Sequence, residues 1–207
     1  PISVARYSDM LLNPGKNFSF NGQTYQYPNI KLVYWAGGHP FHHQMNLSKL
    51  RKATFKPDTI ITNEIWWNSL ARHADIIFPT TTTLERNDIG FRHWEQTVSP
   101  MHKAIDPIGN SRNDFDIFSL ISERLGIKEQ FTENKNEEEW LKTLWDEAKE
   151  SARENNFYLP DFDQFWNGGF FEVLKPTHEQ ILMEDFVKKP KQFPLSNRSK
   201  KIEIFSD

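Results

Sequence analysis

The chain has 207 residues, of which 37% are hydrophobic and 14% aromatic, and this composition excludes wholesale disorder. Its 25 basic and 28 acidic side chains give a net charge of −3, which argues against a dedicated nucleic-acid binder with surplus Lys and Arg. No run of about 18 apolar residues occurs, so no transmembrane segment is predicted, and the lack of cysteine excludes disulfides and thiolate metal ligands within this span.

The first part of the chain predicts a short helix, a hairpin and a strand, in that order. Val4 to Leu12 can form a helix that ends at the turn residues Asn13-Pro14-Gly15. Asn21-Gly22 is typical of a two-residue hairpin turn. The β-branched and aromatic run from Ile30 to Ala36 predicts a buried strand, which a loop over residues 37–44 follows.

Two further strands, alternating with helices, are predicted next. Asn46 is expected to be the N-cap of a helix that precedes a second strand at residues 59–62. A helix is expected over residues 66–73, and residues 75–78 predict a third strand that stops at Pro79. Strands that alternate with helices indicate an α/β fold with a parallel sheet flanked by helices and right-handed crossovers.

The second half of the chain is predicted to be helical and irregular. Residues 80–113 show no regular pattern, whereas residues 114–125 and 137–154 have helical spacing. The remainder is expected to be rich in loops, with aromatic anchors and a strand at residues 170–174. A connector rich in Lys and Pro, residues 188–194, indicates the exit from a domain.

The chain is interpreted as an internal fragment of a longer protein, because it begins on Pro1 and stops soon after a strand-like segment. We expect an α/β segment over residues 1–187, with a helical, loop-rich insert at about 128–187. Residues 188–207 are expected to form a connector that leads to a C-terminal domain outside this chain.

The loop after the first predicted strand contains His39, His42 and His43, and two interpretations of it are open. Three imidazoles at this spacing are compatible with a metal site. However, the cluster contains no acidic residue, and a loop that contains Pro40 does not fix ligand geometry as a helix would. The alternative is that the loop contacts a ligand, because ligands of open α/β sheets bind outside the carboxyl ends of the strands.

Other polar groups near the predicted strand ends are candidate ligand-binding residues, and each has a structural alternative. Asn63 and Glu64 follow the second strand, where a carboxylate binds a ribose hydroxyl or a guanine edge, or interacts with a helix dipole. The charged segments around Arg72 and Arg86 suit a diphosphate, or form structural ion pairs. Asp114 is expected from the local pattern to satisfy backbone donors where a helix begins.

Taken as an ordered set, these segments resemble the molybdopterin oxidoreductases of the dimethyl-sulfoxide reductase family, in the branch of the biotin-sulfoxide and trimethylamine-N-oxide reductases. The resemblance spans most of residues 1–126 and continues more weakly to residue 204. The segments that carry it are Ala5-Arg-Tyr-Ser-Asp-Met-Leu-Leu-Asn-Pro-Gly15, Tyr34-Trp-Ala-Gly-Gly-His-Pro-Phe-His-His43, Lys56-Pro-Asp-Thr-Ile-Ile61, Trp66-Trp67, Ala71-Arg-His-Ala-Asp-Ile-Ile-Phe-Pro79, Leu84-Glu-Arg-Asn-Asp-Ile-Gly90 and Ser111-Arg-Asn-Asp-Phe-Asp-Ile-Phe118.

The resemblance implies an enzyme that holds molybdenum between a pair of molybdopterin guanine dinucleotides and reduces an S-oxide or N-oxide by oxygen-atom transfer. Its partners would be the remaining domains of the same polypeptide, the small oxide substrate and an electron donor. The dinucleotides of such enzymes lie at strand ends of Rossmann-like domains, in agreement with the usual binding of ligands outside the carboxyl ends of the strands.

The resemblance also implies which residues bind the cofactor. These are Gly38, His39 and Pro40 against one dinucleotide, Asn63 and Glu64 at the guanosine end, Arg86 near the phosphates, Asp114 at a base or ribose, and Arg72, His73 and Asp75 in a motif of partly structural role. No residue of this span is expected to be catalytic. In the family the molybdenum-ligating side chain, a serine in this branch, lies upstream, and a C-terminal barrel that completes the dinucleotide pockets lies downstream.

One residue departs from the family pattern, because His39 stands where the family usually has Asn. A neutral imidazole donates from only one nitrogen, so its contact with the cofactor must differ from that of an amide. Two alternatives to the reductase remain open. One is a binding or scaffold module that keeps the family fold without the cofactor. The other is a zinc hydrolase built on the histidine cluster, which would require a nearby general base.

Overall fold

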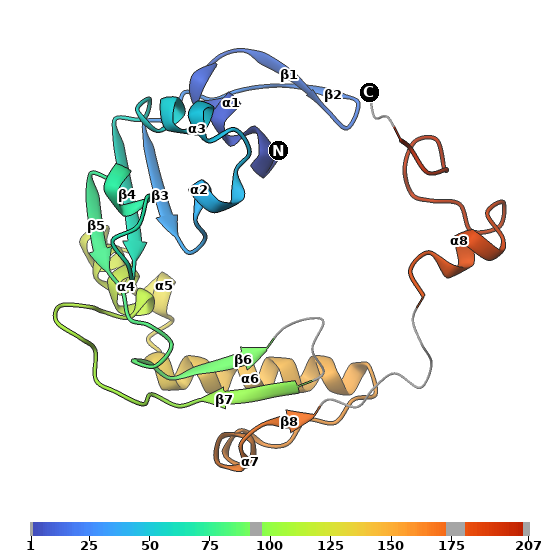
Figure 1. Cartoon of the computed structure of the whole chain (residues 1–207). Coiled ribbons are helices and arrows are strands. Elements are labelled where there is room, and N and C mark those ends of the chain that lie inside the picture. The colour runs from blue at the N-terminus through green and yellow to red at the C-terminus, as the bar shows by residue number, and fades with distance from the viewer. Residues whose placement is uncertain (1, 92–96, 173–180, 205–207) are drawn as a thin grey trace.

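The computed structural model describes residues 2–91, 97–172 and 181–204. In Figure 1 the described elements follow one another around a wide arc. One side of the arc carries a parallel sheet, a second side carries an antiparallel sheet with a long helix, and a short C-terminal segment lies apart. The predicted α/β class, with a parallel sheet flanked by helices, is confirmed.

The N-terminal segment folds as its local sequence predicts. A short 3-10 turn, η1 (Val4–Arg6), leads into α1 (Tyr7–Leu12), and the hairpin β1 (Asn17–Phe20) and β2 (Gln23–Gln26) follows. Asn21 and Gly22 both have positive φ, of 49° and 74°, which is the requirement of the tightest hairpin turns.

The parallel sheet has the strand order β3-β4-β5, with β3 (Leu32–Ala36), β4 (Thr59–Glu64) and β5 (Ile76–Pro79). The helix α3 (Leu47–Thr54) connects β3 to β4, and the Asn46 side chain accepts a hydrogen bond from the backbone N–H of Lys49, 3.1 Å away. This N-cap confirms the prediction. The two faces of β3 meet different helices: Trp35 packs against Tyr7 of α1, and Tyr34 packs against a later helix, α4 (Asp114–Arg124).

Three details of this sheet were predicted wrongly. The helix expected over residues 66–73 is reduced to the 3-10 turn η2 (Ala71–His73), because the Asn68 side chain accepts from two backbone N–H groups and holds a turn instead. Pro79 is the last residue of β5 rather than its stop. Only the central strand β4 is well buried, whereas β3 lies at the edge of the sheet and Leu32 is 54% exposed.

A hydrophobic core of Val98, Trp145, Leu159 and Phe165 lies under an antiparallel sheet that the sequence did not predict. The strands β6 (Asp88–Phe91), β7 (Thr97–Met101) and β8 (Phe171–Glu172) pair in that order, so residues 80–113 are not wholly irregular. The helices α6 (Glu137–Glu154) and α7 (Phe162–Gly168) pack with this sheet, and α7 replaces an expected loop. Trp145 of α6 stacks on Phe165 of α7 at 3.7 Å between ring centroids.

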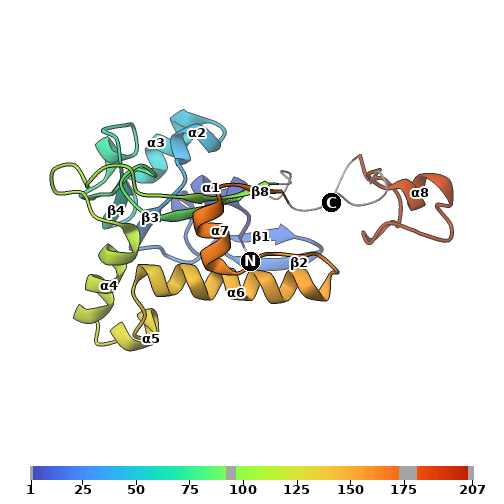
Figure 2. The same ribbon diagram turned by 90° about the horizontal axis from the view of Figure 1, so that it is seen from below.

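The helical region confirms its predicted bounds. The α4 helix is followed by Gly126 at a φ of 73°, a helix-ending conformation that favours glycine, and then by α5 (Lys128–Thr132). The α6 helix begins with a capping box between Asn136 and Glu139. Figure 2 shows α4 and α5 together at the end of the molecule opposite α8 (Glu184–Lys188).

The C-terminal part of the chain makes few contacts with the rest. No residue of α8 is buried, and no further helix or strand is assigned to residues 189–204. Of the strand expected at residues 170–174, residues 171 and 172 form β8, and residues 173 and 174 lie outside the described residues. Within the described ranges, no helix has both the length and the apolar character needed to span a bilayer.

Candidate ligand site at the carboxyl ends of the parallel strands

The carboxyl ends of β3, β4 and β5 meet at one edge of the sheet, where parallel α/β proteins bind ligands. At this edge β3 runs into Gly37 and Gly38, which both have positive φ, at 79° and 75°. Side chains are strained in that conformation, so two adjacent glycines permit the sharp turn. His39 follows as the N-cap residue of α2 (Pro40–His43), whose first residue, Pro40, is buried.

The His39 ring lies at this turn, and its two nitrogens, Nδ1 and Nε2, are both buried and lack hydrogen-bond partners among the described residues. The ring contacts His42 edge to face, at 4.3 Å between centroids. Because buried polar atoms normally have partners, these two nitrogens indicate a place where a further molecule or chain segment bonds.

A hydrogen-bonded triad lies across the strand ends. The Tyr34 hydroxyl of β3 donates to Oδ1 of Asn63 on β4, at 2.7 Å, and Nδ2 of Asn63 donates to Oδ1 of Asp114 on α4, at 2.6 Å. Asn63 is only 7% exposed. Burial, followed by the negative charge of Asp114, raises the pKa of Tyr34, so its hydroxyl keeps the proton that it donates.

The chain brings Asp114 to this edge by a short backbone ladder. The N–H of Arg112 donates to the carbonyl of Pro79 at 3.1 Å, and the N–H of Thr81 donates to the carbonyl of Arg112 at 3.1 Å. Asn113, rather than Asp114, is the N-cap of α4, and its side chain accepts from the N–H of Phe115. A helix cap is therefore present where the sequence predicts one, but Asn113 rather than Asp114 supplies it, because the carboxylate of Asp114 faces Asn63.

Glu64 and Thr81 complete the polar groups at this edge. Oε1 of Glu64 accepts from the backbone N–H groups of Ile65 and Trp66, at 3.0 and 3.4 Å. Glu64 thus stabilises a turn and is not a helix-dipole partner, since no helix starts there. The hydroxyl of Thr81 is buried and has no partner among the described residues, like the nitrogens of His39.

The predicted residues Arg72, His73 and Asp75 are not brought to the carboxyl edge by the strands. The Asp75 carboxylate accepts from the backbone N–H of Ile60 at 2.7 Å, near the amino ends of β4 and β5. Arg72 is exposed. The ring of His73 packs on Phe41 of α2, at 4.6 Å between centroids, so it supports the helix that follows the two glycines.

Arg86 and its neighbour Glu85 organise the loop after β5. The Arg86 guanidinium donates to Oδ2 of Asp88 and to the carbonyl of Thr81, and these bonds use three of its five N–H donors within the described part of the chain. Glu85 is 4% exposed and accepts from the hydroxyl and N–H of Thr82 and from the N–H of Ile108. The Thr82 hydroxyl, followed by the backbone donors of Thr82 and Ile108, lowers the pKa of Glu85 from 4.5 to about 2.

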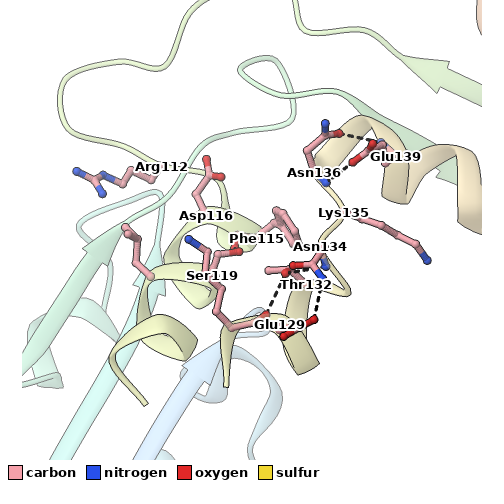
Figure 3. Close-up of a pocket in the computed structure, with 12 residues that line it drawn as sticks. Arg112, Phe115, Asp116, Ser119, Glu129, Thr132, Asn134, Lys135, Asn136 and Glu139 are labelled. Carbon is pink, nitrogen blue, oxygen red and sulfur yellow. Dashed lines mark hydrogen bonds between the residues drawn. The ribbon is translucent and has the colours of Figure 1, made fainter. Parts of the chain in front are cut away.

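Two clefts lie beside the strand-end site rather than in it. The larger, of about 880 Å³, lies between α4, α5 and the start of α6, as Figure 3 shows. Most of its lining residues are polar or charged, and several already bond to one another. The side chain of Asn134 donates to Oε1 of Glu129, and the side chains of Asn136 and Glu139 each accept from the backbone N–H of the other. The other, of about 700 Å³, is a mainly apolar groove between Phe78 of β5 and the α4 residues Ile117 and Leu120. None of the predicted site residues lines either cleft.

Sequence reasoning missed Tyr34, Thr81 and Glu85. A signal for Glu85 was available, since a carboxylate after four consecutive threonines has many possible donors nearby. No local signal identifies Tyr34, because its partner Asn63 is distant in sequence.

The zinc alternative finds no support in the geometry. Across residues 2–91, 97–172 and 181–204, no group of three or more His, Asp or Glu side chains is arranged to hold a metal ion. His39 and His42 are in contact, but without a third ligand.

The fold places the chain in a class, the α/β proteins with a parallel sheet flanked by helices, and open sheets of this class commonly bind ligands outside the carboxyl ends of their strands. Within that class, the family model described as "Molybdopterin oxidoreductase" matches residues 4–124, which is more than half of the chain. The chain belongs to the molybdopterin oxidoreductase family. The matched range contains all ten predicted cofactor-binding residues.

Curated relatives match almost the whole chain. It is 42% identical to the trimethylamine-N-oxide reductase of Haemophilus influenzae, over 99% of this chain and 25% of the relative. It is 43% identical to the biotin sulfoxide reductase of Cereibacter sphaeroides, over 96% of this chain and 27% of the relative. The chain therefore spans about a quarter of the length of these relatives.

A solved structure confirms the fold at low sequence identity. The acetylene hydratase from Pelobacter acetylenicus matches 87% of this chain and 22% of its own chain, with a TM-score of 0.55 and 15% identity. At that identity the likeness concerns the fold alone.

Proposed function

We propose that this chain is a cofactor-binding segment of a molybdenum reductase whose whole polypeptide reduces S-oxides or N-oxides. The substrates would include trimethylamine N-oxide, biotin sulfoxide, methionine sulfoxide or similar compounds. Family membership and the names of the relatives support this proposal. The remaining domains of the same polypeptide and an electron donor complete the system.

We further propose that the cofactor is molybdenum held by a pair of molybdopterin guanine dinucleotides. When bound, the group would supply the redox chemistry of oxide reduction. The residues of this chain would bind and orient it, with Gly38, His39 and Pro40 at one dinucleotide, and Asn63 and Asp114 at a guanosine end.

The observation that carries the proposal is the set of unused polar atoms at one sheet edge. These are both ring nitrogens of His39, the hydroxyl of Thr81, and Oδ2 of Asp114, which has no hydrogen-bond partner among the described residues. They provide donors and acceptors of the kind that phosphates, ribose hydroxyls and nucleobases require. The residues present therefore fit a nucleotide-bearing cofactor.

Glu64, Arg72, His73, Asp75 and Arg86 enter the proposal with smaller roles. Two N–H donors of Arg86 have no partner among the residues that the structure describes, and such donors are suited to a phosphate. Glu64, His73 and Asp75 hold the turns and strand ends in place, and Arg72 offers an exposed charge.

A reductase assay on the intact polypeptide tests this function. With a chemically reduced dye as electron donor, the enzyme should oxidise the dye in proportion to an added S-oxide or N-oxide. If a preparation that contains molybdenum oxidises the dye with none of the S-oxides or N-oxides tested, the proposed reductase activity is contradicted. A properly matured preparation with neither molybdenum nor activity would favour the scaffold module.

A further inference from the structure

We propose that Tyr34 is a positioning residue for nucleobase recognition, which acts on Asp114 through the side-chain amide of Asn63. The proposal rests on the proposed function, because it concerns the guanosine end of that cofactor. The role of Tyr34 goes beyond the proposed function, because Tyr34 would act without touching a ligand atom and would help to determine which edge of the base is bound.

The direction of each hydrogen bond in the triad follows from its chemistry. A carboxylate only accepts, so the group of Asn63 that faces Asp114 at 2.6 Å must be its NH₂. The carbonyl oxygen of Asn63 then faces Tyr34, and the Tyr34 hydroxyl must donate to it, at 2.7 Å. Loss of the hydroxyl leaves the carbonyl oxygen of Asn63 without its donor, so that only the bond to Asp114 then fixes the position of the amide.

Packing fixes Tyr34 itself. Its ring lies 5.3 Å from Phe118 of α4 and 6.4 Å from Phe78 of β5, between centroids. The hydroxyl is therefore held between the sheet and α4, the two elements that the Tyr34–Asn63–Asp114 triad joins. Asn63 is almost fully buried, so water is a poor substitute for the phenol at its carbonyl oxygen.

The triad leaves acceptor positions of the Asp114 carboxylate for a ligand that has paired N–H donors. Asn63 occupies one acceptor position of Oδ1, and Oδ2 has no partner among the described residues. Asp114 is the first residue of α4. An ionised carboxylate can accept two parallel N–H bonds. The guanine of the proposed cofactor would present two neighbouring N–H donors to this carboxylate on its pairing edge, whereas an adenine would present a donor beside an acceptor.

The test compares Tyr34→Phe with a matched control, Tyr25→Phe, in the intact, cofactor-loaded polypeptide. Tyr25 donates its hydroxyl to Gln23 in the exposed hairpin, so its variant removes the same atom far from the strand ends. The measured quantity is the half-life of bound guanosine nucleotide in mild urea, with folding followed by circular dichroism. Tyr34→Phe should shorten the half-life roughly three- to tenfold, and Tyr25→Phe should leave it unchanged.

A double variant separates positioning from a general loss of stability. If Tyr34 acts through Asp114, the Tyr34→Phe change should have no effect on the half-life when Asp114→Asn is already present. An equal shortening in both backgrounds would overturn the proposal, as would an unchanged half-life in Tyr34→Phe alone. A wild-type polypeptide that carries molybdopterin without any guanosine nucleotide would refute the dinucleotide form of the cofactor instead.

Discussion

Asp114 and Asn113 are neighbours with different roles, and this difference gives a sharp prediction. The carboxylate of Asp114 faces Asn63 and keeps an oxygen for a ligand, whereas Asn113 caps α4 and donates to Glu137 at 2.7 Å. In Asp114→Asn the new amide can still accept from Asn63 through its oxygen, but it turns an NH₂ toward the ligand donors. Loss of charge-assisted bonds there should weaken cofactor binding by about 2–3 kcal/mol, which is roughly 30- to 150-fold.

The matched control is Asn113→Ala, which removes a helix cap worth about 1 kcal/mol. We expect it to lower the melting temperature of the intact polypeptide while the guanosine nucleotide content stays at the wild-type level. Asp114→Asn should do the reverse, with a small thermal shift and a large loss of nucleotide. The assay pairs thermal unfolding with nucleotide released by acid. Equal losses of nucleotide in the two variants would show that Asp114 acts only through the stability of α4.

Three further predictions concern acid stability, the core around Trp145 and the turn at His39. Because the Thr82 hydroxyl and backbone donors lower the pKa of Glu85 to about 2, its contribution to the unfolding free energy is complete above pH 4.5 and is lost as the pH falls toward 2. Glu85→Gln should flatten an acid titration of stability over this window, and an unchanged profile would contradict the assignment. Trp145→Ala should cost about 3 to 5 kcal/mol in denaturant unfolding, whereas Leu144→Ala on the same helix, at a half-exposed position, should cost less than about 1 kcal/mol; similar costs would place the core elsewhere. His39→Phe should reduce bound nucleotide without lowering the melting temperature, because the ring nitrogens have no partner to lose among the described residues, and a lower melting temperature would reveal a structural role.

Local signals predicted the elements whose stabilising contacts are local. The Asn21-Gly22 turn, the Asn46 cap and the helix at residues 137–154 each depend on contacts within a few residues, and each is confirmed. The antiparallel sheet was missed for two reasons. The pairing of β7 with β8 is distant, since Thr97 faces Glu172. The pairing of β6 with β7 is close in sequence, but Gly90 and Pro100 lie within these strands and are residues that strands disfavour.

The site was predictable to the level of the sheet edge and no further. Asn63 lies at the end of its strand, so a parallel sheet places it at the carboxyl ends. Asp75 precedes its strand, so the same reasoning places Asp75 at the amino ends, and the structure shows it there. The meeting of Asn63 with Asp114 depends on the ladder between residues 79–81 and 112, and this contact has no local pattern.

The content of molybdenum and acid-released guanosine nucleotide in the intact polypeptide is the most direct test of whether this chain belongs to a cofactor-binding reductase. Both quantities report on the cofactor itself and are independent of which oxide the enzyme reduces. A fully matured preparation should contain about one molybdenum and about two guanosine nucleotides per chain. A matured preparation that contains neither would contradict the cofactor-binding reductase and would leave a protein that keeps the family fold without the cofactor.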